Sequence, residues 1–314
     1  MANFAGVPLA EVVRAGAIES VHSGHLALIN SDGTLRAAIG DIDAPMYPRS
    51  SIKSFQAAAM VRNGLNVSPK ELAMVCASHS GSPSHFLVVE SILAGAGLTV
   101  ADLQNSTDYP LGRAEKAAWG DKPPSRLAQG CSGKHAGMLA TCVINGWDTL
   151  TYLDPEHPLQ IAIRQEIQSL IGESVLSTTV DGCGAPLFLI TTGGFAKGAH
   201  TMRVSSDPVY QEVVSACMAH PEMVAGLGRL TTTLMQQIPS LFVKDGAEAV
   251  ELLSLPDGRA CVFKVSDGSD RTFPAIVKAV LTAWNIDADI DPVPVKGGGQ
   301  VTGEIRVSPV LHQL

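Results

Sequence analysis

The sequence lacks the features that membrane-spanning, exported and nucleic-acid-binding proteins need. No apolar run approaches the roughly 20 residues that cross a bilayer. The first residues also lack the charged start and long apolar stretch of a signal peptide. Lysine and arginine number 22 against 30 acidic residues, and the resulting net charge of −8 disfavours a polyanionic partner. We therefore expect no membrane segment, no export signal and no nucleic acid.

Cysteine, charge and aromatic residues are also scarce. Six cysteines scattered over 314 residues do not make the dense framework of a small secreted domain, so we expect reduced thiols in a cytoplasmic protein. Charged residues make up 17% and apolar residues 46% of the chain, which excludes a disordered chain or a coiled coil. The remaining class is a globular protein that acts on a small molecule.

The apolar pattern predicts strands at both ends of the chain and helices between them. Strand-like runs with turn signals at 22–25 and 31–33 indicate an antiparallel meander near the N-terminus. We predict one domain, 1–314, of the α/β (α+β) class: an antiparallel sheet from about 8–45 and 240–314, and a mainly helical lobe from about 50–238. Helices are expected from residue 50 and over 69–75, 85–96, 134–144, 158–171, 186–195, 208–219, 221–237 and 274–284.

The first candidate for chemistry is the Ser-x-x-Lys pattern of Ser50 and Lys53. If Ser50 opens a helix, Lys53 lies one turn away on the same face. A lysine that burial keeps neutral can take the serine proton, and the helix N-terminus favours developing negative charge. A chain with 26 serines and 10 lysines contains about one such match by chance. A serine cap followed by an exposed lysine fits the same letters.

Two further segments combine polar groups in the same way. Ser78, His79 and Ser80 follow an apolar helix and form either a functional loop or a capping cluster for the next helix. Cys131, Lys134 and His135 share one face at a helix start. With Cys183 they could supply two thiolates and a nitrogen to a zinc ion that keeps one open position, or the cysteines could simply lie in the core.

Taken together, these segments resemble the rhizobial-type L-asparaginases over most of the chain. The resemblance implies a fold like those of serine β-lactamases and glutaminases, and hydrolysis of the side-chain amide of L-asparagine to aspartate and ammonia. The motifs that carry it are Pro-Arg-Ser-Ser-Ile-Lys at 48–53, Met-Val-Cys-Ala-Ser-His-Ser at 74–80, Cys-Ser-Gly-Lys-His-Ala-Gly-Met-Leu at 131–139, Asp-Gly-Cys at 181–183, His-Pro-Glu-Met-Val-Ala-Gly at 220–226, and Lys264 with Asp-Gly at 267–268.

The resemblance also implies two serine–lysine pairs. Ser50 is then the nucleophile that attacks the amide carbon, and Lys53 takes its proton. Ser78, supported by Lys264, shuttles a proton and holds the tetrahedral intermediate. Relatives form homodimers, so the resemblance implies a homodimer as well.

The implied metal and substrate contacts complete the expected site. The resemblance places zinc on Cys131, Lys134 and Cys183 plus water, where it orients substrate or shapes the pocket wall rather than activating water. Because a lysine ligand must be neutral, the zinc occupancy should fall as the pH falls. The side chains expected to contact the α-carboxylate and α-amino groups of the substrate are Arg49 and Asp181, with Gly182, Ser80 and His135 in the same pocket.

Two other functions fit part of the pattern. A β-lactamase-like or penicillin-binding serine acyl-transferase shares Ser-x-x-Lys, and the run Lys-Gly-Gly-Gly at 296–299 faintly resembles its lysine–glycine strand. A non-enzymatic thiol or metal-binding protein would need only Cys131 and Cys183. Ammonia release, β-lactam cleavage and bound metal distinguish the three.

Overall fold

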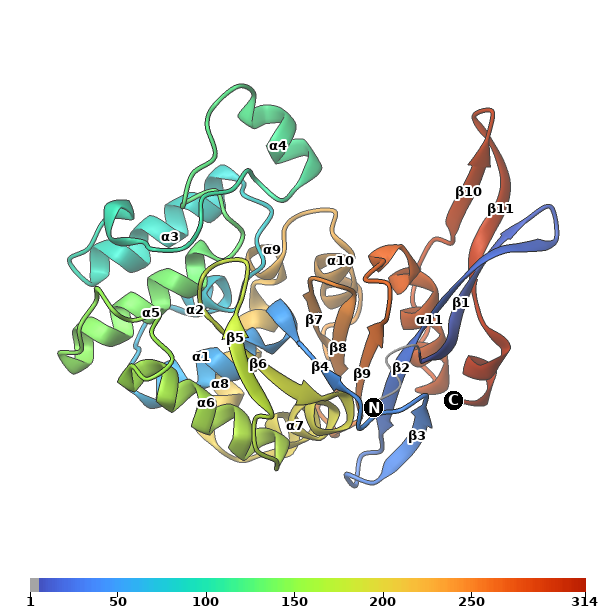
Figure 1. Ribbon diagram of the computed structural model, residues 1–314, viewed down its shortest axis with the longest axis horizontal. Helices are drawn as coiled ribbons and strands as arrows, with labels where there is room; N and C mark the ends of the chain where they lie inside the picture. Colours follow the sequence, from blue (N-terminus) through green and yellow to red (C-terminus); the bar gives the residue numbers. More distant parts are fainter. Residues whose placement is uncertain (1–5) are drawn as a thin grey trace.

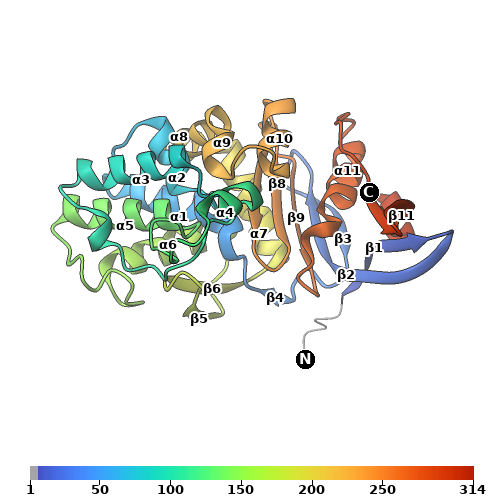
Figure 2. The same cartoon turned by 90° about the horizontal axis from the view of Figure 1, so that it is seen from above.

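The computed structural model describes residues 6–314, in which an antiparallel sheet packs against a helical lobe (Figure 1). Seen from above, the sheet stands between the lobe and helix α11 (Phe273–Ala283) (Figure 2). The predicted α+β class is confirmed, because both ends of the chain supply the sheet and the helices come from between them.

The large sheet joins the first strands of the chain to the last. Its order is β10-β11-β1-β2-β9-β8-β7, with β3 paired to β2, and neighbouring strands are antiparallel. Ala10 of β1 pairs with Val307 of β11, which closes the two ends of the chain together. The strands are β1 (Val7–Arg14), β2 (Ala17–Ile29), β3 (Leu35–Ile39), β7 (Phe242–Gly246), β8 (Val250–Ser254), β9 (Ala260–Val265), β10 (Val293–Gly297) and β11 (Gln300–Val307).

Strand β2 corrects the turn predicted at 22–25. The strand runs without a break through these residues, and the chain turns at Ala15 and Gly16, which both have positive φ. Gly24 serves close packing instead, since a Cβ there would lie 2.1 Å from the Lys264 carbonyl oxygen of β9. A glycine in a strand therefore marked the approach of a second backbone, not a turn.

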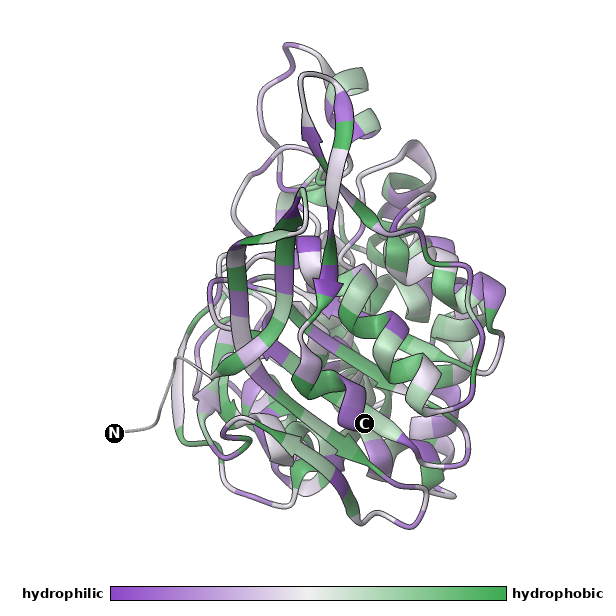
Figure 3. Cartoon of the chain, turned by 90° about the vertical axis from the view of Figure 1, so that its right-hand side faces the viewer, coloured by the Kyte–Doolittle hydropathy of each residue, from purple (hydrophilic) through white to green (hydrophobic). Residues whose placement is uncertain are grey.

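The sheet is covered on both faces over its centre. Polar and apolar residues alternate along the strands that face the viewer in Figure 3. Helix α7 (Thr192–Val204) packs against β2, β8 and β9, and the ring of Phe273 in α11 lies edge-on to Phe263 of β9 with ring centres 5.3 Å apart. As a result, β8 is buried along its whole length.

Two helices of the lobe begin at serine caps. Ser68 and Ser82 form capping boxes at the starts of α2 and α3, each followed by a proline in the first turn. The helices of the lobe are α1 (Lys53–Arg62), α2 (Pro69–Val75), α3 (Pro83–Gly95), α4 (Arg113–Trp119), α5 (Ser132–Asn145), α6 (Pro158–Ile171), α7, α8 (Pro208–Ala219), α9 (Pro221–Val224) and α10 (Leu230–Gln237).

Two of the predicted helices differ in the structure. Residues 186–195 form strand β6 (Pro186–Thr191) before α7 begins, and β6 pairs with β4 (Pro45–Met46) and β5 (Ser177–Val180) in a second, three-stranded sheet. A short buried apolar run is compatible with either element, and periodicity alone does not separate them. Residues 221–237 form α9 and α10, because Gly226 and Gly228 between them have φ of 138° and 77°.

A carboxyl group without a partner is buried in this sheet. Glu251 of β8 is 1% exposed, and neither of its carboxyl oxygens has a hydrogen-bond partner within residues 6–314. Its directly paired neighbours are Asp245 on β7 and Phe263 on β9. Burial, and then the charge of Asp245, raise the pKa of Glu251 well above its ordinary value. The side chain is therefore a neutral acid in the folded protein.

Replacing Glu251 by glutamine should remove a pH dependence of stability. Above the unfolded-state pKa the unfolded chain has released this proton while the folded chain still holds it. The free energy of unfolding should then fall with rising pH by about 1.4 kcal/mol per unit through this group alone. We expect Glu251→Gln to be more stable than wild type at pH 7, and the difference to shrink toward pH 4.5. Urea unfolding across this range measures it.

Glu90→Gln on the exposed face of α3 is the matched control. Its stability difference from wild type should stay near zero at every pH. A constant difference for Glu251→Gln across the range would contradict a buried neutral acid.

Candidate active site

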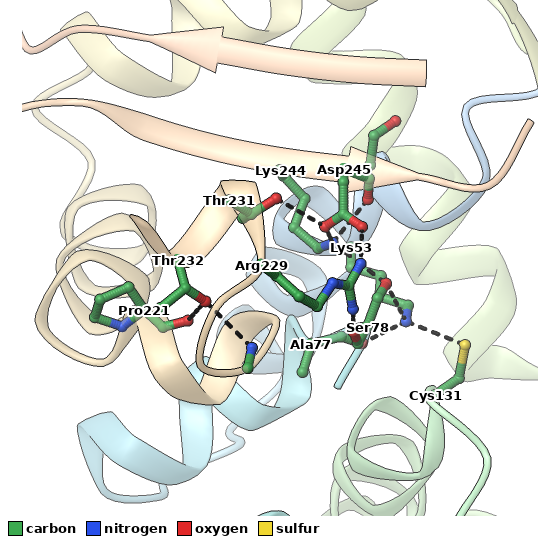
Figure 4. A network of polar contacts seen from close by, with 12 residues as sticks. Lys53, Ala77, Ser78, Cys131, Pro221, Arg229, Thr231, Thr232, Lys244 and Asp245 are labelled. Atoms are coloured by element: carbon green, nitrogen blue, oxygen red, sulfur yellow. Dashed lines mark hydrogen bonds and ion pairs between the residues drawn. The ribbon is translucent and has the colours of Figure 1, made fainter. Parts of the chain in front are cut away.

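The candidate site lies where the start of α1, the loop after α2 and strand β7 meet. Lys53 is the first residue of α1 and is 1% exposed. Its Nζ donates to the Ala77 carbonyl oxygen and lies 3.3 Å from Ser78 Oγ and 3.1 Å from Cys131 Sγ. These contacts are drawn in Figure 4. Desolvation by burial lowers the pKa of Lys53, and the neighbouring ammonium groups of Lys134 and Lys244 lower it further.

Ser50 lies in a tight turn just before this lysine. The turn is a 3₁₀ helix, Arg49–Ile52, and it begins with Arg49 in the left-handed region at φ 51°. That conformation is costly for a residue with a side chain and is often found at functional sites. Within residues 6–314 the Ser50 hydroxyl makes no hydrogen bond, and Lys53 Nζ contacts Ala77, Ser78 and Cys131 instead of Ser50. Ser50 is half-buried, so it stays available to a ligand.

Three consecutive backbone N–H groups hold the loop that carries Ser78. Its N–H donates to Val224 O at 2.9 Å, the next residue His79 donates to Gly130 O at 3.1 Å, and Ser80 donates to Ala225 O at 2.7 Å. Cys76 ends α2 just before this loop. The loop is therefore held between the turn that ends α9 and the loop that precedes α5. Function-bearing loops on rigid scaffolds have this kind of support.

The second lysine beside Ser78 is Lys244, not Lys264. Lys244 Nζ on β7 lies 3.3 Å from Ser78 Oγ and is fully buried. Lys264 lies two strands away on β9, and its ammonium donates to the carbonyl oxygens of Glu248 at 2.5 Å and Val265 at 2.6 Å. The predicted Ser78–Lys264 contact is thus not made, because the order β9-β8-β7 separates the two lysines.

Lys244 was not among the predicted site residues, although it lies in the segment 240–314 that the sequence predicts as sheet. A lysine–glycine strand was sought at 296–299, but that segment lies in the hairpin of β10 and β11 at the far edge of the sheet. Gly246 is the signal that was available. A Cβ at Gly246 would lie 2.7 Å from Pro48 O and 2.9 Å from Ser51 N, so β7 approaches the turn of Ser50 with no side chain between them.

Cys131, Lys134 and Cys183 form a second buried cluster beside Lys53. Cys131 precedes α5, Lys134 lies in its first turn, and Cys183 follows β5. Lys134 Nζ lies 3.4 Å from Cys183 Sγ, and the two sulfurs lie close enough to shift each other's pKa. All three side chains are at most 8% exposed. The sequence therefore identified residues that the fold brings into one place.

The interaction between the two sulfurs shifts their pKa values in opposite directions. It raises the pKa of Cys131 to about 12, with burial acting in the same direction. It lowers the pKa of Cys183 to about 5, and the ammonium of Lys134 also favours this thiolate. For Lys134, burial opposes the charged form, but the two sulfurs outweigh it and raise the pKa. Cys183 is thus the more acidic of the two thiols, and Lys134 favours its thiolate.

The same cluster can be tested against the expected zinc. Within residues 6–314 no group of three or more His, Cys, Asp or Glu side chains is arranged to hold a metal ion. Cys131 and Cys183 are two adjacent soft ligands, and Lys134 adds an amine when it is neutral. This donor set fits zinc, with Cys131 and Lys134 each having to lose a proton on binding. Zinc remains a prediction.

Arg49 and Asp181 contact each other in this structure. Arg49 Nε donates to Asp181 Oδ1 at 2.7 Å, and the N–H of Gly182 donates to the same oxygen at 2.8 Å. Burial alone would raise the pKa of Asp181, but Lys134 and Arg49 outweigh it and lower the pKa. Ser106 Oγ donates to Gly182 O at 2.8 Å and holds this loop in place. The pair joins the turn of Ser50 to the cysteine cluster.

Ser80 and His135 are deeper than the sequence suggested. Ser80 is 1% exposed, and its carbonyl oxygen accepts from Gly112 N at 2.9 Å. His135 is fully buried, and its Nδ1 lies 2.7 Å from the Tyr152 hydroxyl. Burial lowers the pKa of His135 to about 3. Both side chains support the surrounding walls in this structure, and their contact with substrate remains a prediction.

Adding a methyl group at Gly246 should strain the junction of β7 and the Ser50 turn. Because the new Cβ would meet backbone atoms of Pro48 and Ser51, we expect Gly246→Ala to lower the free energy of unfolding by about 1–3 kcal/mol. Gly95→Ala at the end of α3 is the control, since nothing lies within 4 Å of a Cβ there. Urea unfolding measures both, and equal stabilities would contradict the close approach.

The chain was compared with curated proteins and with solved structures. No curated protein matches the chain. Among solved structures, a putative β-lactamase from Bacteroides dorei is 13% identical over 82% of this chain and 93% of its own, with a TM-score of 0.47. A β-lactamase from Mycobacterium bovis is 14% identical over 84% of this chain and 95% of its own, with a TM-score of 0.42. The native form of Mglu is 12% identical over 85% of this chain and 66% of its own, with a TM-score of 0.47.

No helix within the described residues is both long and apolar enough to cross a bilayer.

The sequence itself gives a more specific match. The family model of L-asparaginase II matches residues 10–307, which include the serine, lysine and cysteine residues described above. The match runs from the first strand of the large sheet to the last, so it covers both the sheet and the helical lobe. The chain belongs to the L-asparaginase II family.

Proposed function

We propose that the protein hydrolyses the side-chain amide of L-asparagine to L-aspartate and ammonia. The observation that carries the proposal is the buried amine of Lys53, which contacts Ser78 and follows Ser50 by three residues. Membership of the L-asparaginase II family supports an amidohydrolase. The choice of asparagine, and the use of serine and lysine, are the parts that the experiments below test.

In the first step, Ser50 Oγ attacks the amide carbon of the substrate. A bond forms between oxygen and carbon, and the hydroxyl proton passes to the neutral amine of Lys53. The lowered pKa of Lys53 supports this role, because a buried lysine without a paired anion loses its proton more easily. The free hydroxyl of Ser50 can turn toward the substrate without breaking a bond in the protein.

In the second step, the tetrahedral intermediate releases ammonia. The nitrogen needs a proton before the carbon–nitrogen bond breaks, and Ser78 Oγ can pass it on. Ser78 lies 3.3 Å from both Lys53 Nζ and Lys244 Nζ, so a proton taken up by Lys53 has a short route to the leaving group. Water then attacks the ester on Ser50 while Lys53 removes a proton from that water. The bond between the carbon and Ser50 Oγ breaks, Lys53 returns the proton to Ser50 Oγ, and aspartate is released.

Arg49 and Asp181 are suited to the charged end of the substrate. Their contact uses Nε of Arg49 and leaves both terminal guanidinium nitrogens and the second oxygen of Asp181 without hydrogen bonds within residues 6–314. An arginine suits a carboxylate, and an aspartate suits an ammonium group. This complementarity supports an α-amino acid as substrate. Gly182 lies beside them.

Zinc would be held by Cys131, Lys134 and Cys183 when bound. It would supply positive charge beside the substrate pocket and fix the position of the loops that carry these residues. The chain's own residues still provide the nucleophile and the proton carriers. A homodimer is a further expectation from the family resemblance.

Replacing the nucleophile or its base should abolish turnover while leaving the fold intact. We expect Ser50→Ala to lower kcat for ammonia release from L-asparagine by at least about a thousandfold. Lys53→Met and Ser78→Ala should lower it by about 10²- to 10⁴-fold, because each removes a proton-transfer group. A coupled ammonia assay gives the rates, and circular dichroism checks the fold.

Ser68→Ala is the matched serine control, since Ser68 only caps α2 away from the site. It should lose stability of about 1 kcal/mol and keep its turnover. Normal turnover in Ser50→Ala would overturn the nucleophile, and glutamine cleaved faster than asparagine would overturn the substrate.

Ser78 is a second candidate for the nucleophile, because two lysine amines lie 3.3 Å from its oxygen. A covalent label separates the two serines. An asparagine analogue that carries a diazoketone in place of the amide should form an adduct, and peptide mass spectrometry locates it. We expect the adduct on Ser50, and an adduct on Ser78 would exchange the two roles.

A serine acyl-transferase that acts on β-lactams is the alternative function. Ser-x-x-Lys at 50–53 and Lys-x-Gly at 244–246 lie on either side of Ser78, which is the set of elements that β-lactamases use. A chromogenic cephalosporin tests it directly. Cleavage of the cephalosporin without ammonia release from asparagine would favour the alternative.

Metal binding gives an independent prediction. We expect the purified protein to hold zinc, and Cys183→Ser and Cys131→Ser to lose most of it, because each removes one of two sulfur ligands. Mass spectrometry of the metal content after dialysis measures this without any activity assay. Cys142→Ala in the last turn of α5 is the control and should keep its zinc. Equal zinc in all four proteins would exclude this site.

A further inference from the structure

One arginine beside the site has no part in the chemistry described so far. Arg229 stands immediately before α10, after the turn that contains Gly226 and Gly228. Its backbone N–H donates to Gly226 O at 3.2 Å, so the turn holds the residue in place. Figure 4 shows its guanidinium group between the Ser78 loop and strand β7.

The two terminal nitrogens of this guanidinium bind two different parts of the site. Nη1 donates to the backbone oxygen of Ser78 at 2.5 Å, and Nη2 donates to Asp245 Oδ2 at 2.5 Å. The Ser78 loop follows α2 and Asp245 is in β7, more than 160 residues further along the chain. Because a guanidinium group is planar and rigid, these two bonds fix the distance between the loop and the strand.

Asp245 passes the constraint on to Lys244. Its other oxygen, Oδ1, lies 2.9 Å from Lys244 Nζ and 3.3 Å from Thr231 Oγ1. Burial would raise the pKa of Asp245, but Lys244 and Arg229 outweigh it and hold that pKa well below its usual range. The carboxylate therefore stays charged, with one oxygen for each cation. Without Arg229, nothing would fix Oδ2, and the carboxylate could rotate away from Lys244.

We propose that Arg229 is a positioning residue that, through the Ser78 carbonyl and Asp245, holds the Ser78 hydroxyl and the Lys244 amine at hydrogen-bonding distance. The inference rests on the proposed role of Ser78 and Lys244 as proton carriers. Arg229 would therefore lower the barrier for proton transfer, and it would not contribute to substrate binding. Both terminal nitrogens are already engaged by the protein, so neither has to bind a substrate carboxylate.

The test compares Arg229→Met, Arg229→Lys and wild type. Methionine keeps the apolar stem but removes both bonds, and we expect kcat to fall about 10²-fold with KM changed less than threefold. Lysine can reach one partner but cannot form both bonds at once, so it should recover only part of the loss. Added methylguanidinium should restore part of the kcat of Arg229→Met by filling the vacated space.

Arg306→Met is the matched arginine control. Arg306 binds Glu11 with two nitrogens at 2.9 and 3.0 Å on the outer strands, away from the site. It should lose a charged pair and keep kcat, KM and any response to methylguanidinium unchanged. A raised KM with unchanged kcat in Arg229→Met would assign the residue to substrate binding, and unchanged kinetics would leave it no role. Either result overturns the inference.

A second readout separates this inference from the proposed function. The rate at which a fluorophosphonate labels the active serine depends on serine activation but not on the natural substrate. We expect labelling to be about 10²-fold slower in Arg229→Met than in Arg306→Met. A wild-type chain that is labelled but releases no ammonia from asparagine overturns the proposed function, while the labelling ratio still decides on Arg229. Equal labelling of the two variants overturns the positioning role.

Discussion

Three lysine amines in one buried cluster are the constraint on which the site depends. Lys53, Lys134 and Lys244 are each at most 2% exposed, and a buried cation is costly unless it is paired or loses its proton. Lys134 has the Cys183 thiolate beside it, and Lys244 has the Asp245 carboxylate. Lys53 has only a carbonyl, a hydroxyl and a thiol. Among the described residues, Lys53 is therefore the buried amine without a neighbouring carboxylate, and burial lowers its pKa.

The fold places these lysines together by bringing backbones into close contact. Gly246 lets β7 approach the turn before α1, and Gly133 lies so close to α2 that a Cβ would be 2.3 Å from Met74 O. Such contacts leave no room for water between the elements. Because these close backbone contacts are rigid, ordinary hydrogen bonds are sufficient to hold the lysine and serine side chains in place.

Charge in the site is balanced locally rather than through a general surface potential. Asp245 serves two cations, and Asp181 binds Arg49 while lying close enough to Lys134 to lower its own pKa. Glu251, paired with Asp245 on the next strand, remains neutral because burial and the charge of Asp245 raise its pKa. The net charge of −8 thus says little about the site, where lysine and arginine side chains outnumber ionised carboxylates.

Much of the local structure and part of the site could be inferred from the sequence alone. Ser68 and Ser82, each followed by proline, determine where α2 and α3 begin, because capping is a local interaction. The short spacings of Ser50 with Lys53 and of Cys131 with Lys134 are likewise local, so helix geometry relates the members of each pair. The alternation of strands and helices along the chain was enough to predict the α+β class.

Only the tertiary structure decided which distant residues meet. The strand order β9-β8-β7 places Lys244, and not Lys264, beside Ser78, and no local pattern encodes strand order. The same holds for β6, whose buried run is equally compatible with a helix, and for Gly24, whose role depends on a strand 240 residues away. The sequence alone determined the contacts between residues that are a few positions apart in the chain, because these contacts depend on local backbone geometry. Contacts between remote segments depend on packing, which the whole chain determines at once.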